Sequence, residues 1–314
     1  MGGSKETMIG RGTIKGSAAL ALVAVIWGVG YVQMRSGASF LGPFIFNGLR
    51  YALGCLSLTP VMGFLYYRER QGAAPDDGGP GSCEDNRVYL RGGLLAGLIL
   101  YLGMSVSQIG LIFTTASKAG FLTAMYIVLV PIVGLFLKKK SHWNTWVSVA
   151  IGGVGLYFLS ITGNFVFAPG DAIVLTSSLF WSVHVYVIDY YVNRTDILKF
   201  MFVQFALCSL LSFITSPFLD RAFISGAVFQ GLLEAVPHLL FLGILSSGLA
   251  FCLQGYGQRR VPPSAAALIM SFEAVFGMLC GVLVLGETMT PRELFGCFLM
   301  FCAVLLAQLP AKKQ

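Results

Sequence analysis

A unit of five apolar segments occurs twice along this chain, and the odd number of segments constrains the fold more than any other feature. A unit with an odd number of membrane crossings begins and ends on opposite sides of the bilayer. Its second copy must therefore enter the membrane upside down. Inverted repeats of this kind are common in secondary transporters, whose substrate sites lie near the midplane between the two halves.

The duplication can be followed along the sequence. The segment "GSAALALVAVIWG", which begins at Gly16, recurs 154 positions later as "GDAIVLTSSLFWS", and this shift aligns Trp27 with Trp181. With a shift of 148, residues 116–148 fall on residues 264–296 without a gap. Because few residues are identical, the inference depends on the ordered match of all five segments.

The composition requires the bilayer as solvent. Of the 314 residues, 56% are hydrophobic and only 11% are charged, and the mean hydropathy is +0.78. A soluble protein of this length would have too little polar cover. Ten segments are close to the length of about 20 residues that crosses a hydrocarbon core. They are predicted as helices at 16–34, 40–66, 92–112, 116–137, 145–161, 170–191, 197–217, 235–257, 263–285 and 292–309.

The predicted fold class is an all-α membrane protein with ten transmembrane helices, arranged as two inverted five-helix repeats. Residues 1–15 form a cytoplasmic segment, and residues 16–161 form the first repeat. Within it, residues 68–91 are expected to be a flexible cytoplasmic loop, because they are polar and rich in Gly and Pro. Residues 162–309 form the second repeat, and 310–314 form a cytoplasmic tail.

Basic residues predict that both termini lie in the cytoplasm. On this topology sixteen Lys and Arg residues fall on the inner side, whereas Arg35, Lys118, Arg221 and Arg292 fall on the outer side. This is the positive-inside pattern. It accounts for the net charge of +7, so nucleic acid is not a predicted partner. The first span is interpreted as uncleaved rather than as a signal peptide. We expect a monomer or homodimer in the lipid bilayer of a bacterial inner (plasma) membrane.

Two charged residues are predicted near the middle of the bilayer. Arg50 lies ten residues into its span, roughly 15 Å deep at 1.5 Å per residue, and Glu273 is similarly central. Such charges are costly in lipid, so they face the bundle interior or a wet cavity. In one interpretation Arg50 attracts a carboxylate or phosphate and Glu273 takes a cation or proton. In the other, they pair with each other or with helix carbonyls as a structural lock or gate.

Other candidate residues are distributed over several spans. Lys118 either snorkels to the outer headgroups or forms an anion-attracting mouth. His184 is a candidate for proton coupling, together with Glu273 and Asp189, although a packing role for the histidine is the alternative. Aromatic and amide side chains suit a wall for an amphipathic organic solute, and they equally suit ordinary packing. These are Trp27, Trp181, Tyr126, Gln108, Gln254, Tyr256 and Asn47.

Three stretches resemble the EamA-type branch of the drug/metabolite transporter superfamily. They are "IWGVGYVQMRSGASFLGPFIFNGLRYALG", "TTASKAGFLTAMYIVLVPIVGLFL" and "SAAALIMSFEAVFGMLCGVLVLGETMTPRELFGCFLMFCAVLLA". The resemblance covers residues 16–309 and implies two inverted repeats, a central cavity and movement of small organic solutes such as amino acids, commonly outward. The sequence departs from the family in two places: a common Glu-Pro pair reads Glu273–Ala274, and Lys138–Lys140 replaces an acidic residue after the fourth helix.

No motif indicates an enzyme, a cofactor or a metal site, because neither a Walker-type loop nor a cluster with metal or nucleophile spacing occurs in the sequence. The predicted function is a secondary active or facilitative exporter of small organic metabolites, with alternating access around a central cavity and protons as a candidate coupling ion. An alternative is an importer or exchanger of an anionic metabolite, such as a nucleotide, a sugar phosphate or an S-adenosylmethionine-like solute. A further alternative is a receptor or scaffold without transport.

Overall fold

The protein is helical, without a strand, over the residues that the computed structural model describes: 3–70, 86–114, 116–139, 143–160, 169–220, 228–285 and 290–308. This confirms the all-α prediction for these residues. The helices are α1 (Gly3–Leu41), α2 (Pro43–Arg70), α3 (Asn86–Ile112), α4 (Ala116–Ala124), α5 (Tyr126–Phe136), α6 (Trp143–Ser160), α7 (Pro169–Val192), α8 (Ile197–Leu219), α10 (Val228–Leu240), the π-helix η1 (Phe241–Leu249), α11 (Ala250–Gln258), α12 (Pro263–Met270), α13 (Glu273–Leu285) and α14 (Pro291–Gln308).

Within the described part of the chain, six helices are long and apolar enough to cross a membrane. They are α1, α2, α3, α7, α8 and the continuous helix formed by α10, η1 and α11, and each coincides with a predicted span. Three shorter apolar stretches, Leu122–Phe136, Pro263–Gly277 and Leu294–Leu306, fall within three further predicted spans. By length and composition, the chain is therefore an integral membrane protein with multiple crossings.

Two predicted spans are interrupted near their middle. The span 116–137 consists of α4 and α5 with a turn at Met125, and the span 263–285 consists of α12 and α13 with a turn at Ser271 and Phe272. The shift of 148 takes position 125 to 273, so the interruptions lie at nearly the same place in the two halves. Irregular backbone at membrane depth is tolerated where it is buried in protein or lines a water-filled cavity.

Several predicted boundaries differ from the structure. Helix α1 continues past position 34 to Leu41, because the segment expected as a loop before the second span is helical. Residues 68–70 and 86–91 of the predicted loop also belong to helices, and the rest of that loop lies outside the described residues. The predicted span 235–257 begins earlier in the structure, because α10 starts at Val228 and continues directly into η1.

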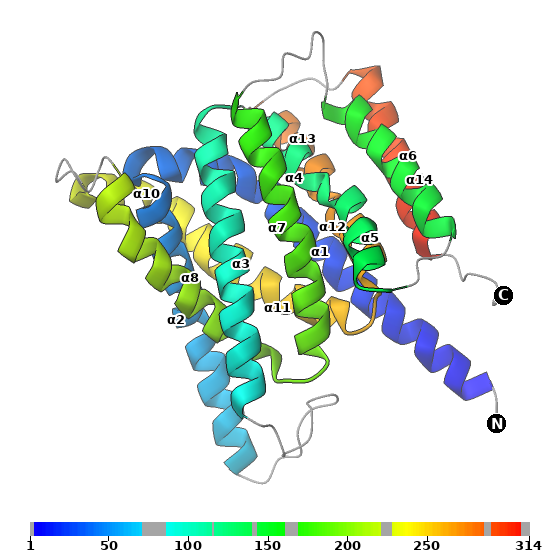
Figure 1. The fold of residues 1–314 in the computed structure, drawn as a ribbon, viewed down its shortest axis with the longest axis horizontal. Helices are drawn as coiled ribbons and strands as arrows, with labels where there is room; N and C mark the ends of the chain where they lie inside the picture. Colours follow the sequence, from blue (N-terminus) through cyan, green and yellow to red (C-terminus); the bar gives the residue numbers. More distant parts are fainter. Residues whose placement is uncertain are drawn as a thin grey trace.

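The helices pack as a bundle around α1 and α7 (Figure 1). Helices α6 and α14 pack against each other at one side of the bundle, while α2 and α8 pack against each other at the opposite side. Helix α3 contacts both α7 and α8, and α1 contacts α10, α11, α12 and α13. The centre of the bundle is therefore bounded by helices from both halves of the chain.

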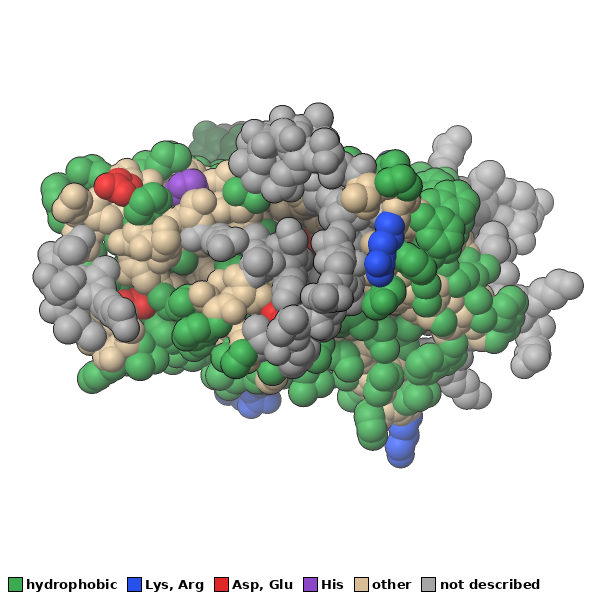
Figure 2. Space-filling view, turned by 90° about the horizontal axis from the view of Figure 1, so that it is seen from above, with side chains coloured by type: hydrophobic (Ala, Val, Ile, Leu, Met, Phe, Trp, Pro, Cys, Tyr) green, Lys and Arg blue, Asp and Glu red, His purple; other side chains and the backbone are tan. Residues whose placement is uncertain are grey.

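The two ends of the bundle differ in the connections between helices that lie there. The end where α2 finishes and α3 begins, called here the predicted inner end, also holds the α7–α8 and α11–α12 connections (Figure 1). The opposite end is called the predicted outer end. Figure 2 views the molecule from that side, where hydrophobic side chains surround the periphery and few described Lys or Arg side chains are visible.

Asp220 joins the two halves at the predicted outer end. Helix α1 ends at Leu41, and the φ of +90° at the next residue, Gly42, lies in the left-handed region that glycine adopts readily. The first N–H groups of a helix have no partner within that helix. Those of Phe44 and Ile45 donate to Asp220 Oδ1 and Oδ2 over 3.2 and 2.6 Å. Asp220, which follows α8, therefore caps the N-terminus of α2.

We expect Asp220→Ala to lower the stability by about 1–3 kcal/mol, because two N–H groups at the start of α2 lose their acceptor in a buried position. Thermal unfolding of the purified protein in detergent measures the effect. Glu234→Ala provides the control, since Glu234 is an exposed acid on α10. Equal melting temperatures for the two variants would contradict the capping role.

Candidate functional site

A cavity lies at the centre of the bundle, with about 630 Å³ of empty space including its opening to solvent. Helices from both halves line it, and its described walls combine five Trp, Tyr and Phe side chains with one histidine, one arginine and one glutamate. The lining residues are Trp27, Gly30, Tyr31, Met34, Arg50, Met104, Ser107, Thr123, Tyr126, Trp181, His184, Val185, Ser246, Phe251, Gln254, Met270 and Glu273.

Arg50 of α2 is held by the π-helix η1. Its side chain is only 2% exposed. Nε donates to Ser247 Oγ and Nη2 donates to Ser246 Oγ, both over 3.0 Å. The remaining group, Nη1, is buried and has no hydrogen-bond partner among the residues that the structure describes. The guanidinium group is thus fixed by two hydrogen bonds and keeps N–H groups that a solute in the cavity could bind.

The backbone geometry of η1 makes these contacts possible. A π-helix closes i→i+5 hydrogen bonds and frequently occurs at functional sites. Here it presents two consecutive serine hydroxyls to Arg50. The same stretch approaches α2 closely, since a Cβ added at Gly243 would lie 3.1 Å from the carbonyl oxygen of Arg50. The small residues of "LGILSSGL" therefore allow this contact between the helices.

Glu273 lies where the ninth predicted span is interrupted. It is the first residue of α13 and is 3% exposed. The hydroxyl of Tyr31 on α1 donates to Glu273 Oε1 over 3.3 Å. A negative charge in the first turn of a helix is favoured by the helix dipole. The carboxylate is therefore placed by the start of α13 and oriented by a hydrogen bond from α1.

Arg50 and Glu273 do not pair with each other. Their hydrogen bonds go to Ser246, Ser247 and Tyr31, and no hydrogen bond or ion pair joins the two charges among the described residues. Both nevertheless line the same cavity. The structure thus brings the two predicted central charges to one site and leaves a separate positive and a separate negative group on its wall.

His184 contributes through packing and one hydrogen bond. Its Nε2 lies 3.1 Å from Gln204 Oε1. Its ring makes edge contacts with Trp181 and Phe251, with centroid distances of 5.9 and 6.0 Å. The indole N–H of Trp181 has no partner within the described part of the chain, whereas that of Trp27 donates to the carbonyl oxygen of Ser246 over 3.1 Å. The two aligned tryptophans therefore differ in what they can offer a solute.

Comparison with known proteins identifies the family. The sequence profile of the EamA-like transporter family matches residues 14–161 and again residues 168–309. The chain belongs to the EamA-like transporter family. The resemblance found in the sequence is confirmed, and transport is the activity for which this family is named.

Full-length relatives are also named as transporters. An "Uncharacterized transporter" of Archaeoglobus fulgidus is 31% identical over 92% of this chain and 84% of its own length. "Uncharacterized transporter YoaV" of Bacillus subtilis is 23% identical over 90% of this chain and 93% of its own. One crystal structure has the same fold, with a TM-score of 0.69, 16% identity and coverage of 93% of this chain and 96% of the other.

The structure places most of the predicted candidates on the wall of this EamA-like transporter's cavity. Seven line it: Arg50, Glu273, Trp27, Trp181, Tyr126, Gln254 and His184. Among these, the Tyr126 hydroxyl and Gln254 Oε1 are buried and find no hydrogen-bond partner in the described ranges. They are further polar groups that a solute could bind.

The other candidates lie away from the described lining. Asn47 and Gln108 are each 1% exposed, and the amide atoms of both lack partners. They lie within one helical turn of the lining residues Arg50 and Met104, respectively. Tyr256 packs beneath the guanidinium group of Arg260 at 3.7 Å. Asp189 forms an ion pair with Lys139, and the side chain of Lys118 lies outside the described residues.

Some residues that line the cavity were not predicted from the sequence, although helical spacing from the two tryptophans pointed to several of them. Tyr31 and Met34 follow Trp27 by four and seven residues, and Val185 follows Trp181 by four. Residues at these spacings share one face of a helix, so each tryptophan could have identified its neighbours. Ser246 had no such signal, because its position depends on the π-helix.

We expect Arg50→Lys to lower the melting temperature, because an ammonium group cannot reproduce the fork of donors that bridges two hydroxyls. The loss of a hydrogen bond to a charged group corresponds to about 1.5–3 kcal/mol. Thermal unfolding in detergent measures it against Arg68→Lys, which changes an exposed arginine of the same helix. Identical unfolding of both variants would show that the two serine contacts contribute nothing to stability.

Proposed function

We propose that this chain is a secondary active or facilitative exporter of small organic metabolites, namely amino acids or related solutes, and that it alternates access around the central cavity. The observation that carries the proposal is a neutral, aromatic-walled cavity lined from both matched halves. Small-molecule sites in proteins are typically apolar with a few placed polar groups. The relatives named as transporters support the class of activity.

The proposal includes ten crossings arranged as two inverted repeats. Each interrupted helix, α4–α5 and α12–α13, counts as one crossing, and α6 and α14 complete the two sets of five. Matched contacts support this arrangement. A Cβ added at Gly110 would lie 3.1 Å from the Gly170 carbonyl oxygen, and one added at Gly257 would lie 3.0 Å from the Gly16 carbonyl oxygen. The shift of 154 relates 16 to 170, and a shift of 147 relates 110 to 257.

The cavity wall supports the same symmetry. Four pairs of lining residues are related by the shift of 154 in the first helix of each copy or by the shift of 147 in the third. A cavity whose walls come from equivalent positions is what alternation about a pseudo-two-fold axis requires. The pairs are Trp27 with Trp181, Tyr31 with Val185, Met104 with Phe251, and Ser107 with Gln254.

The charges of the cavity favour a neutral or zwitterionic solute. Arg50 is the one Lys or Arg residue and Glu273 the one acid among the described lining residues. A nucleotide or sugar phosphate would bring several negative charges toward a carboxylate, with a single guanidinium group to offset them. Like charges at short range in a site of low dielectric constant repel strongly. We therefore favour amino acids over the anionic metabolites of the alternative proposal.

Location and orientation are part of the proposal. We propose that both termini face the cytoplasm and that the protein acts in a bacterial inner (plasma) membrane as a monomer or homodimer. The excess of basic residues at the predicted inner end supports this orientation. The receptor or scaffold alternative has no comparable support, because sensing does not need two matched halves around a cavity.

Counterflow in liposomes tests the transport function. Purified protein is reconstituted, and exchange is measured with a panel of labelled amino acids, nucleotides and sugar phosphates, with protein-free liposomes as the blank. We expect exchange of apolar or aromatic amino acids and no exchange of sugar phosphates. Exchange of phosphorylated solutes alone would favour the alternative substrate class. No exchange by folded protein over the whole panel would count against a transporter.

Glu273 is the residue that we propose for proton coupling. It is the one acid among the described residues that line the cavity, and within those residues its side chain forms a hydrogen bond with Tyr31 alone. Asp189 is less suited to this role, since it is paired with Lys139. If transport is coupled to protons, an imposed pH gradient drives solute uptake by the wild type. Glu273→Gln removes the titratable group, so the response to the gradient should be lost while exchange remains.

Glu234→Gln provides the matched control for that experiment, since it makes the same change at an exposed position of α10. Uptake that still follows the pH gradient in Glu273→Gln would exclude Glu273 as the coupling residue. His184→Gln would then be the next variant to measure, because His184 also lines the cavity.

A further inference from the structure

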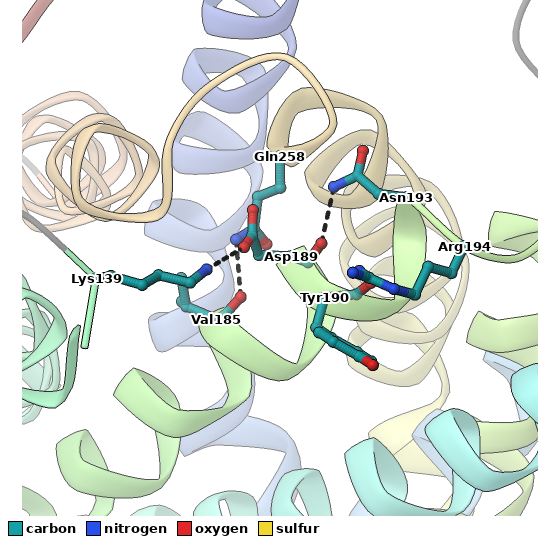
Figure 3. Close-up of polar contacts among 7 residues, drawn as sticks. All are labelled: Lys139, Val185, Asp189, Tyr190, Asn193, Arg194 and Gln258. Carbon is teal, nitrogen blue, oxygen red and sulfur yellow. Dashed lines mark hydrogen bonds and ion pairs between the residues drawn. The ribbon is translucent and has the colours of Figure 1, made fainter. Parts of the chain in front are cut away.

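An ion pair joins the two halves of the chain at the predicted inner end (Figure 3). Lys139 follows α5 in the first matched region, and Asp189 belongs to α7 in the second. Lys139 Nζ lies 2.7 Å from Asp189 Oδ2, and the two side chains are 46% and 16% exposed. The same ammonium group lies 4.8 Å from the centre of the Tyr186 ring. The contact therefore connects segments that belong to different repeats.

This contact lies directly beyond the cavity. Val185 lines the cavity, and Asp189 follows it by four residues on the same helix, which is roughly 6 Å along the axis. The carbonyl oxygen of Val185 accepts a hydrogen bond from Gln258 Nε2 of α11 over 3.0 Å, as Figure 3 also shows. Three elements, namely the end of α5, α7 and α11, are thus tied together between the cavity and the predicted inner end.

We propose that the Lys139–Asp189 ion pair is a latch that holds the predicted inner end of the cavity closed. The inference rests on the proposed function, because a latch between the halves has a purpose only if the halves move. In the state that opens the cavity toward the inner side, α5 and α7 separate and the ion pair is broken. In the structure described here, the latch is closed.

The strength of the contact suits a reversible latch. Partly exposed ion pairs contribute little stability and are screened by salt. A buried pair without other partners would make separation far more costly. With Lys139 nearly half exposed, water can solvate both charges when they part. The contact can bias the equilibrium between two states without locking either of them.

The sequence places the opposite charges at the equivalent positions of the other half. The shift of 154 takes Arg35 to Asp189, and the shift of 148 takes Lys139 to Glu287. An acid and a base therefore exchange places between the two copies. Of these two equivalents, Glu287 lies outside the described residues, and the side chain of Arg35 does as well. The latch is inferred from Lys139 and Asp189 alone.

Accessibility of the cavity from each side of the membrane tests the latch. In a background without the seven native cysteines, Ser107→Cys places one thiol on the cavity wall. A membrane-impermeant maleimide is then applied to inside-out and right-side-out vesicles that contain the full-length protein. Lys138→Cys, at an exposed neighbouring position, identifies the vesicles that present the predicted inner end to the reagent.

Lys139→Gln and Asp189→Asn should each increase the rate at which the Ser107→Cys thiol is labelled from the predicted inner end by about two- to fivefold. This is the change in equilibrium that the loss of a partly exposed ion pair produces. The exchanged variant Lys139→Asp with Asp189→Lys restores the pair and should return labelling toward the wild-type rate. Lys139→Arg keeps the charge and should also label slowly. Lys138→Gln is the matched control, and it should leave the rate unchanged.

Unchanged labelling in both single variants would overturn the latch. If either of them fails to fold, as judged by size-exclusion chromatography, the exchanged variant and Lys139→Arg decide. Rapid labelling of either one, in folded protein, would equally overturn it. Labelling needs no substrate, so this result is independent of counterflow. If the wild type exchanges amino acids in counterflow but the latch variants label at the wild-type rate, the latch is refuted and the proposed function is left intact.

Discussion

The structure depends on one constraint, which is that backbone N–H and C=O groups in a hydrocarbon core must form their hydrogen bonds within their own segment. Regular α-helices satisfy it, so departures from them within the spans need a compensating environment. Three such departures adjoin the cavity: the turn before Tyr126, the turn before Glu273 and the π-helix that contains Ser246. The site is therefore built where the regular helix is interrupted and neighbouring helices exclude lipid.

The π-helix also marks a difference between the two halves. A Cβ added at Gly97 would lie 2.8 Å from the Gln204 carbonyl oxygen, and one added at Gly243 would lie 3.1 Å from that of Arg50. The two contacts are equivalent, because Gly97 and Gly243 are 146 positions apart and positions 50 and 204 are 154 apart. Beyond η1, the offset between the same two helices is 147 instead of 146, as for Gly110 and Gly257. On the proposed repeat, the second half contains one more residue within Phe241–Leu249 than the first, and the wider i→i+5 turn accommodates it. This extra residue lies in the same π-helix whose Ser246 and Ser247 hydroxyls accept hydrogen bonds from Arg50.

Much of the fold could be predicted from the sequence because hydrophobic length and charge bias are properties of whole segments. The predicted central positions of Arg50 and Glu273 are cavity positions in the structure, because depth along a span follows from counting residues. Details that depend on backbone irregularity could not be predicted. Neither the turn at Met125 nor the π-helix is marked by a local sequence motif. Ser246 was missed for this reason.

The two central charges take their hydrogen-bond partners from opposite halves of the chain. Arg50 belongs to the first matched region and bonds Ser246 and Ser247 of the second, whereas Glu273 belongs to the second and bonds Tyr31 of the first. Each charge is therefore positioned by the opposite half. In the proposed cycle, any rotation of one half against the other changes the surroundings of both charges together. Because the groups have opposite sign, a zwitterionic solute that spans them would experience that change at both of its ends.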